Sequence, residues 1–206
     1  MRIHAAGKSA IAKFLFSALI ISIIYVGFMP HMTVFVLALI LYLSGLFLCW
    51  FFRDPERSTS AADTAILSGA DGKVLTVAKL DHAWEIDGPA IRVSVFMSPL
   101  NVHVNRTSIS GKIKKVDYRP GEYLMAFYEK SSEKNEANLI VVEDEKGRCV
   151  GQRQIAGFLA RRVVCFAQEG DTYDRGARYG IIKLGSRMDH FLPADQVNVC
   201  VKAGDK

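Results

Sequence analysis

Two long apolar segments open the chain, and neither of them shows a polar face. The first covers residues 14–29 and the second covers residues 32–52, with Pro30 and His31 between them. A helix that spans a membrane needs about 20 apolar residues, a length that the second segment reaches and the first reaches when a few preceding residues are included. Because a soluble helix normally keeps one polar side, the pattern predicts an N-terminal hydrophobic helical hairpin over residues 1–52.

The charges that flank the two segments predict the orientation of this hairpin. Lys8 and Lys13 precede the first segment, Arg53 and Arg57 follow the second, and the turn between the segments has neither Lys nor Arg. The positive-inside rule therefore places both ends of the hairpin in the cytoplasm. A cleaved signal peptide is the alternative, but its apolar core is followed by small residues at a cleavage site and not by a longer apolar segment.

Short β-rich segments follow one another at close spacing in the rest of the chain, and Gly, Asp and Pro turns separate many of them. This pattern is typical of a barrel or a sandwich, and the helical signals are weak apart from a short turn at 156–161. The predicted fold class is mainly β: a compact β-barrel or β-sandwich domain over 53–206, preceded by the hairpin. The predicted strands cover 73–77, 90–96, 111–118, 137–144, 149–156, 162–167, 178–183 and 196–201.

Charge and cysteine content narrow the classes of function. The 26 Lys and Arg against 21 Asp and Glu give a net charge of +5, and the three basic residues before residue 53 leave only +2 for the rest. No dense basic patch occurs, so nucleic acid is not a predicted partner. The four cysteines form no CxxC pair and the histidines show no HExxH spacing, so no metal is predicted. Unpaired cysteines fit a reducing compartment.

Three separated segments carry residues that are suited to nucleophilic chemistry. Asp71 lies in an Asp-Gly turn, which by itself is a common turn. His103 follows an apolar strand, where a lone histidine is more often structural than catalytic. Gly185 and Ser186 end another apolar strand, where a hydroxyl can reach a glycine carbonyl if the backbone is strained. Each signal is weak alone, whereas Ser, His and Asp together supply a nucleophile, a base and a carboxylate that orients the base.

Taken together and in this order, the segments resemble the phosphatidylserine decarboxylase family in its short, membrane-associated form. The resemblance covers nearly the whole of residues 51–206, although Gly69 stands where the family usually has Pro, and Arg187 stands where its longer members have Thr. Neither departure falls on Asp71, His103, Gly185 or Ser186. The matching stretches are 51–57, 70–74, 97–106, 118–121, 135–136, 154–157, 161–162 and 180–189.

The resemblance implies a proenzyme that makes its own covalent pyruvoyl cofactor. On this reading the hydroxyl of Ser186 attacks the carbonyl of Gly185, and the chain is cut between them. The products are a β chain of residues 1–185 and an α chain of residues 186–206, which begins with the pyruvoyl group formed from Ser186. The resemblance makes His103 the general base, oriented by Asp71, and a candidate donor of the proton that the decarboxylated substrate needs.

The implied reaction is the decarboxylation of phosphatidylserine to phosphatidylethanolamine and CO2 in phospholipid biosynthesis. A carbonyl cofactor suits this reaction because it accepts the electrons that the departing CO2 leaves behind. The charges that flank the hairpin place the catalytic domain on the cytoplasmic face of the cell membrane, where it reaches phosphatidylserine in the bilayer. The family also implies a homodimer. Arg106 and Arg187 flank the predicted site and are candidates for holding the lipid phosphate.

Two other readings of the sequence stay open. The first is a decarboxylase that acts on a related seryl lipid with ether-linked chains, such as archaetidylserine. The second is a membrane-anchored binding module, because residues 169–180 resemble the hairpin turns of biotinyl and lipoyl carrier domains. A carrier domain needs a lysine at an exposed hairpin tip, whereas Lys183 lies within or beside a predicted strand.

Overall fold

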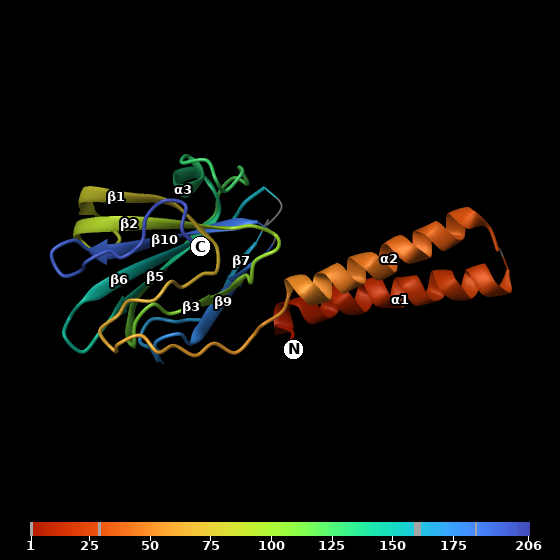
Figure 1. The fold of residues 1–206 in the computed structure, drawn as a ribbon, viewed down its shortest axis with the longest axis horizontal. Coiled ribbons are helices and arrows are strands. Elements are labelled where there is room, and N and C mark those ends of the chain that lie inside the picture. Colours follow the sequence, from red (N-terminus) through yellow and green to blue (C-terminus); the bar gives the residue numbers. More distant parts are fainter. Residues whose placement is uncertain (1, 29, 159–161, 184) are drawn as a thin grey trace. The chain divides into compact units, whose positions relative to one another are not determined.

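The computed structural model describes residues 2–28, 30–158, 162–183 and 185–206. The chain divides into two compact units, Met1–Glu56 and Arg57–Lys206 (Figure 1). Some predictions fall outside the described residues: the end of the first apolar segment at Met29, the second half of the short turn at 156–161, and the matches at Arg161 and Leu184.

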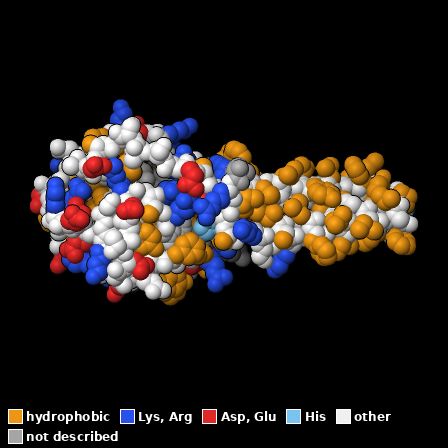
Figure 2. Space-filling model, turned by 90° about the horizontal axis from the view of Figure 1, so that it is seen from below, with side chains coloured by type: hydrophobic (Ala, Val, Ile, Leu, Met, Phe, Trp, Pro, Cys, Tyr) orange, Lys and Arg blue, Asp and Glu red, His pale blue; other side chains and the backbone are white. Residues whose placement is uncertain are grey.

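The first unit is a hairpin of two helices, α1 (Ala5–Gly27) and α2 (Met32–Phe51). Small residues let the helices approach closely, because a Cβ atom on Gly45 would lie 2.7 Å from a methyl group of Leu15. Both helices are long and apolar enough to cross a membrane, and hydrophobic side chains cover the face of the hairpin seen in Figure 2. The predicted hairpin is confirmed, although its first helix begins nine residues before the predicted residue 14.

The second unit is built from two antiparallel β-sheets (Figure 1). The larger sheet has the strand order β1-β2-β10-β6-β5-β4-β8, and the smaller has the order β3-β9-β7. Because β1 and β8 are the two open edges of the larger sheet, the fold is sandwich-like. The mainly β prediction is confirmed, and its barrel alternative is wrong. The strands are β1 (Lys73–Ala83), β2 (Gly88–Met97), β3 (Val104–Arg106), β4 (Gly111–Arg119), β5 (Ala137–Glu143), β6 (Cys149–Ile155), β7 (Val163–Cys165), β8 (Thr172–Tyr173), β9 (Arg178–Ile182) and β10 (Ser186–Pro193).

One hydrophobic core cluster joins the two sheets. Met97 on β2, Ile140 on β5 and Met188 on β10 are fully buried in it, together with Tyr179 and Ile182 from β9 of the smaller sheet. The last strands of the chain thus contribute to both sheets. The residues that connect β9 to β10 consequently lie where the chain passes from one sheet to the other.

The predicted strands up to residue 183 each overlap an observed strand, but the end of the chain differs from the prediction. Residues 196–201 form no strand, and the last strand is instead β10 at the centre of the larger sheet. The short strands β3 and β8, and the one-turn helix α3 (Ser131–Lys134), were not predicted. The alternation of residues 196–201 reflects Val197 and Val199 packing against the core without a strand partner.

Candidate functional site

The junction between Gly185 and Ser186 lies at the start of the central strand β10. Ser186 is the first residue of this strand and pairs with Met97 at the end of β2. Gly185 has a φ of +71°, in the left-handed region that a residue with a side chain adopts only with strain. The sequence therefore has a glycine where the backbone turns sharply into β10, and this turn presents the Gly185 carbonyl next to a serine.

The side chain of Ser186 is fully buried, and its Oγ has no hydrogen-bond partner among the described residues. A buried hydroxyl without a partner costs stability, so it calls for an explanation. Ser108 also has a buried Oγ without a described partner. The surroundings of the two serines differ. Ser186 directly follows Gly185, which has a positive φ, and the N–H of Gly185 contacts a buried histidine.

That histidine is His103, which is fully buried. The N–H of Gly185 donates to Nε2 of His103 at 3.2 Å, and Nδ1 of His103 lies 3.0 Å from the carbonyl oxygen of Asn101. Since a carbonyl only accepts, Nδ1 must carry the proton and Nε2 must present its lone pair. The structure thus brings His103 to the Gly185–Ser186 junction in the tautomer that a general base needs.

A tight turn holds the backbone that orients His103. Oδ1 of Asn101 accepts hydrogen bonds from the Ser98 N–H at 2.9 Å and from the Ser98 hydroxyl at 2.7 Å. This closed turn fixes the Asn101 carbonyl that receives the proton of Nδ1. Asn101 therefore has a positioning role that the sequence pattern did not reveal.

Asp71 lies at the same end of the larger sheet as Ser186. Lys73 on β1 and Arg187 on β10 both pair with Phe96 on β2. Two inter-strand intervals separate β1 from β10, which corresponds to about 10 Å. The half-exposed carboxylate of Asp71 forms an ion pair with Arg57. Orientation of His103 by Asp71 therefore stays a prediction, while the Asn101 carbonyl is the partner of Nδ1.

Histidine also connects the Asp71 segment to β10. The N–H of Gly69 donates to Nε2 of His190 at 2.9 Å, and His190 is almost fully buried on β10. Burial lowers the pKa of His190 because the charged imidazolium loses its hydration, and the nearby Asp189 carboxylate opposes this only in part. A neutral His190 can accept the Gly69 hydrogen bond and so holds the residues before Asp71 against the strand that begins with Ser186.

The backbone of Gly157 packs against the carbonyl oxygen of Gly185. A Cβ atom on Gly157 would lie 2.2 Å from the carbonyl oxygen of Gly185 and 3.1 Å from Cβ of Ala126. Only a glycine leaves room for the carbonyl at this place. The sequence showed Gly157 in a matching stretch of the family, but nothing in the pattern connected it to Gly185.

The two arginines predicted to flank the site have protein partners. Arg187 is buried, and its guanidinium bonds the carboxylate of Asp189 at 2.6 Å and the hydroxyl of Ser94 at 2.8 Å. Arg106 donates from Nη1 to the carbonyl of Gly176 at 2.8 Å. The guanidinium of Arg187 is therefore held inside the sheet, where it supports β10.

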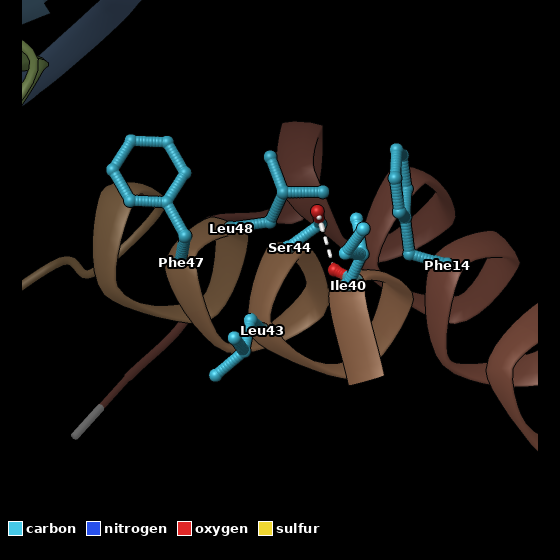
Figure 3. A pocket seen from close by; sticks show the side chains of 6 residues that line it. All are labelled: Phe14, Ile40, Leu43, Ser44, Phe47 and Leu48. Carbon is cyan, nitrogen blue, oxygen red and sulfur yellow. Dashed lines mark hydrogen bonds between the residues drawn. The ribbon is translucent and has the colours of Figure 1, made fainter. Parts of the chain in front are cut away.

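Two hollows lined by described residues differ in polarity. The first lies on the hairpin and has a volume of about 450 Å³. Figure 3 shows that its lining consists of apolar side chains and Ser44, whose hydroxyl donates to the carbonyl of Ile40 at 2.8 Å. No acid, base or cation lines it, so it offers no group for catalysis. The second hollow lies in the β unit and is described below.

Comparison with known proteins places these residues in a family. The family model for phosphatidylserine decarboxylase matches residues 45–206. A phosphatidylserine decarboxylase proenzyme of Amoebophilus asiaticus is 42% identical over 204 residues, which cover 97% of this chain and 91% of that protein. Those of Chlorobium chlorochromatii and Syntrophus aciditrophicus are 49% and 45% identical, over 78% of this chain in both cases and over 74% and 75% of those proteins.

These matches cover far more than half of the chain at high identity. They agree with the resemblance that the separate motifs carried, and they favour an enzyme over a carrier-like binding module. The chain therefore belongs to the phosphatidylserine decarboxylase family.

Proposed function

We propose that this chain is a proenzyme that cuts itself between Gly185 and Ser186 and then decarboxylates phosphatidylserine with a pyruvoyl group made from Ser186. The observation that carries the proposal is the junction itself. A buried serine hydroxyl without a described partner directly follows a left-handed glycine, and the N–H of that glycine contacts Nε2 of a buried histidine.

Self-cleavage uses the hydroxyl of Ser186, the carbonyl of Gly185, a base and one water molecule. The Oγ of Ser186 attacks the Gly185 carbonyl carbon, the C–N bond breaks, and an ester replaces the amide. Loss of the Cα proton of residue 186 then expels the Gly185 carboxylate and leaves dehydroalanine. Water converts dehydroalanine to the pyruvoyl group and releases ammonia. The serine needs a base for the first step because its hydroxyl is a weak nucleophile near neutral pH.

His103 is the base that fits this step. Its Nε2 lone pair points to Gly185, and its Nδ1 proton is held by the Asn101 carbonyl. The carboxylate of Asp71, at the same end of the sheet, would favour the imidazolium that forms. Gly157 leaves the Gly185 carbonyl unobstructed. The pyruvoyl group, once formed, supplies an electron sink for decarboxylation, and His103 would return a proton to the substrate carbon.

The fold explains how a cut chain stays together. The α chain begins with β10, which pairs with β2 on one side and with β6 on the other. Near its end, the N–H of Gly204 donates to the Val74 carbonyl, and the Asp205 carbonyl accepts from the Val74 N–H, both at 2.9 Å. A strand in the middle of a sheet keeps its ladder bonds when the connection before it is cut.

The experiment that tests this proposal is intact mass spectrometry of the purified full-length protein. The wild type is expected as two fragments, of which the one covering residues 186–206 is lighter than its serine-terminated form by one ammonia. Ser186→Ala is expected to remain one uncut chain. Ser108→Ala is the matched control, because it also removes a buried hydroxyl without a described partner, and it should be cut like the wild type. Cleavage after Gly185 in Ser186→Ala would exclude the mechanism.

A further inference from the structure

A polar hollow of about 480 Å³ lies where the two sheets meet in the β unit. Tyr118 on β4 and Asn138 on β5 line it from the larger sheet. Residues 163–165 of β7 line it from the smaller sheet, and Arg162 and Lys183 also line it, next to the ends of β7 and β9. We call it the sheet-junction hollow.

Two cations line this hollow side by side. The main-chain N–H of Lys183 donates to the Arg162 carbonyl at 3.2 Å, so the two residues are neighbours across adjacent strand ends. Among the described residues, no carboxylate forms an ion pair with either side chain. Two positive charges at close range repel each other, and an anion bound between them removes the repulsion. The pair is therefore arranged as an anion site.

The carboxylate of Glu136 bonds two residues that line the hollow. Oε1 of Glu136, which is almost fully buried, accepts from the Tyr118 hydroxyl and from the Val163 N–H, both at 3.2 Å. Desolvation and the charge of Glu136 raise the pKa of Tyr118, and Arg162 opposes this rise. Arg162 thus lies within electrostatic reach of the Tyr118 hydroxyl. With Glu136 counted, the hollow keeps one excess positive charge.

The hollow is close to the proposed cleavage junction. Lys183 precedes Gly185 by two residues, and two residues of chain span at most about 7 Å. The amine of a phosphoserine head group must reach the position of Ser186 in order to react there, and only a short linker separates this amine from the phosphate. The flexible side chain of Lys183 is long enough to meet that phosphate.

The substrate has two anionic groups, a carboxylate and a phosphodiester, and the reaction treats them differently. Decarboxylation consumes the carboxylate charge, so a cation held against the carboxylate would stabilise the ground state more than the transition state. The phosphodiester keeps its charge throughout the reaction, so a cation pair on it contributes binding without opposing the reaction. Arg and Lys are also the side chains best suited to phosphate oxygens.

We infer that the sheet-junction hollow binds the phosphodiester of the lipid head group through Arg162 and Lys183. This inference rests on the proposed function, since it assigns a site to that function's substrate. It also assigns phosphate binding to residues other than Arg106 and Arg187, which were the candidates from the sequence.

The test measures steady-state kinetics on a short-chain phosphatidylserine that stays monomeric, so that no anionic membrane surface contributes. Lys183→Met and Arg162→Met are each expected to raise KM about tenfold, the loss of one charged hydrogen bond, with kcat within about twofold. Both variants should be cut as completely as the wild type in mass spectrometry. Lys183→Arg keeps the charge and should keep KM near the wild-type value.

A second readout does not depend on turnover. In phosphorus NMR, a short-chain phosphatidylethanolamine should show a phosphate shift on titration with the mature wild type and a weaker one with Lys183→Met. Lys112→Met is the matched control, because Lys112 is an exposed lysine of β4 that does not line the hollow, and it should behave as the wild type. Unchanged KM in both hollow variants, or an equal rise in Lys112→Met, overturns the inference. An uncut or inactive wild type would instead contradict the proposed function.

Discussion

At the scale of single residues, the candidate site depends on two glycines more than on charged groups. Gly185 allows the left-handed turn into β10, and Gly157 leaves the space that the Gly185 carbonyl occupies. Neither position holds a reactive side chain. Their effect is to place a carbonyl beside a serine and a histidine, and placement of this kind governs the rate of an intramolecular attack.

Gly157→Ala is expected to slow self-cleavage about 100-fold, because its new methyl group would push the Gly185 carbonyl out of line with Ser186. The rate is measured by following the α fragment over time after synthesis in a cell-free system. Gly88→Ala is the control, since a Cβ atom there meets nothing within 4 Å, and it should be cut at the wild-type rate. Normal cleavage of Gly157→Ala would show that the carbonyl does not need its observed position.

His190 leads to a prediction about acid stability. Burial lowers its pKa below the ordinary value of 6.5, so the unfolded chain binds a proton at higher pH than the folded chain does. This contribution to stability is complete above pH 6.5 and falls as the pH drops below it, by up to about 1.4 kcal/mol per pH unit.

Urea unfolding of the uncut Ser186→Ala protein between pH 7 and pH 5 measures this slope. In the same background, His190→Gln should reduce it, because glutamine can still accept from the Gly69 N–H but does not titrate. An equally steep fall in His190→Gln would assign the acid sensitivity to other groups.

At the scale of elements, β10 organises the β unit and was the hardest strand to predict. All eight of its residues are buried, yet they include Arg187, Asp189 and His190. A sequence pattern recognises a strand by apolar residues on at least one face, but Arg187 and Asp189 share one face of β10, and Ser186 and His190 place polar groups on the other. Arg187 and Asp189 can be buried because they pair with each other and with Ser94 and Ser132, and His190 accepts a hydrogen bond from the Gly69 N–H. Such pairing depends on strands that are distant in sequence.

Apart from the short strands β3 and β8, the other strands were predictable because their hydrophobic residues alternate or form short apolar runs bounded by turns. Asp71, His103 and Ser186 were chosen from the sequence and its family resemblance, and their roles stay predictions. Three contacts were not predictable: the Asn101 carbonyl on Nδ1 of His103, the Gly157 backbone against Gly185, and the Arg57–Asp71 ion pair. Each depends on how separate loops fold over the ends of the sheets.

Asp189→Asn tests how strongly the buried pairing supports β10. Removing the charge leaves the guanidinium of Arg187 buried without its ion-pair partner, which costs about 3–5 kcal/mol. The uncut Ser186→Ala background is again used, and unfolding is measured in urea at pH 7. The control is Asp117→Asn, whose exposed ion pair with Lys115 spans 3.6 Å and whose loss should cost less than about 1 kcal/mol. Equal effects of the two substitutions would contradict a structural role for the buried pair.

At the scale of the whole molecule, a reactive β unit is joined in one chain to an apolar hairpin. The helices of 23 and 20 residues are about 30 Å or more in length, which matches the hydrocarbon thickness of a bilayer. The proposed substrate is itself a membrane lipid. An enzyme anchored in the membrane meets this lipid at a high effective concentration, so the hairpin would favour the proposed reaction.

The hairpin predicts how the protein is released from membranes. Because apolar burial and not charge holds it, the full-length protein should remain in the membrane pellet in high salt, which screens electrostatic attachment, and should be released by detergent. A chain that begins at Arg57, the first residue of the second unit, is the control and should be found in the supernatant. Release of the full-length protein by salt alone would show that the hairpin only lies on the surface.

The same hairpin predicts which side of the membrane carries the β unit. Lys8 and Lys13 lie in the N-terminal half of α1, and Arg53 and Arg57 follow α2, so both ends should stay on the cytoplasmic side. Cys200 is an exposed thiol of the β unit and serves as a reporter in a variant that lacks the other three cysteines. A thiol reagent that cannot cross membranes should leave Cys200 unmodified in intact cells and should label it after lysis. Labelling in intact cells would reverse the orientation and would separate the catalytic unit from cytoplasmic lipid synthesis.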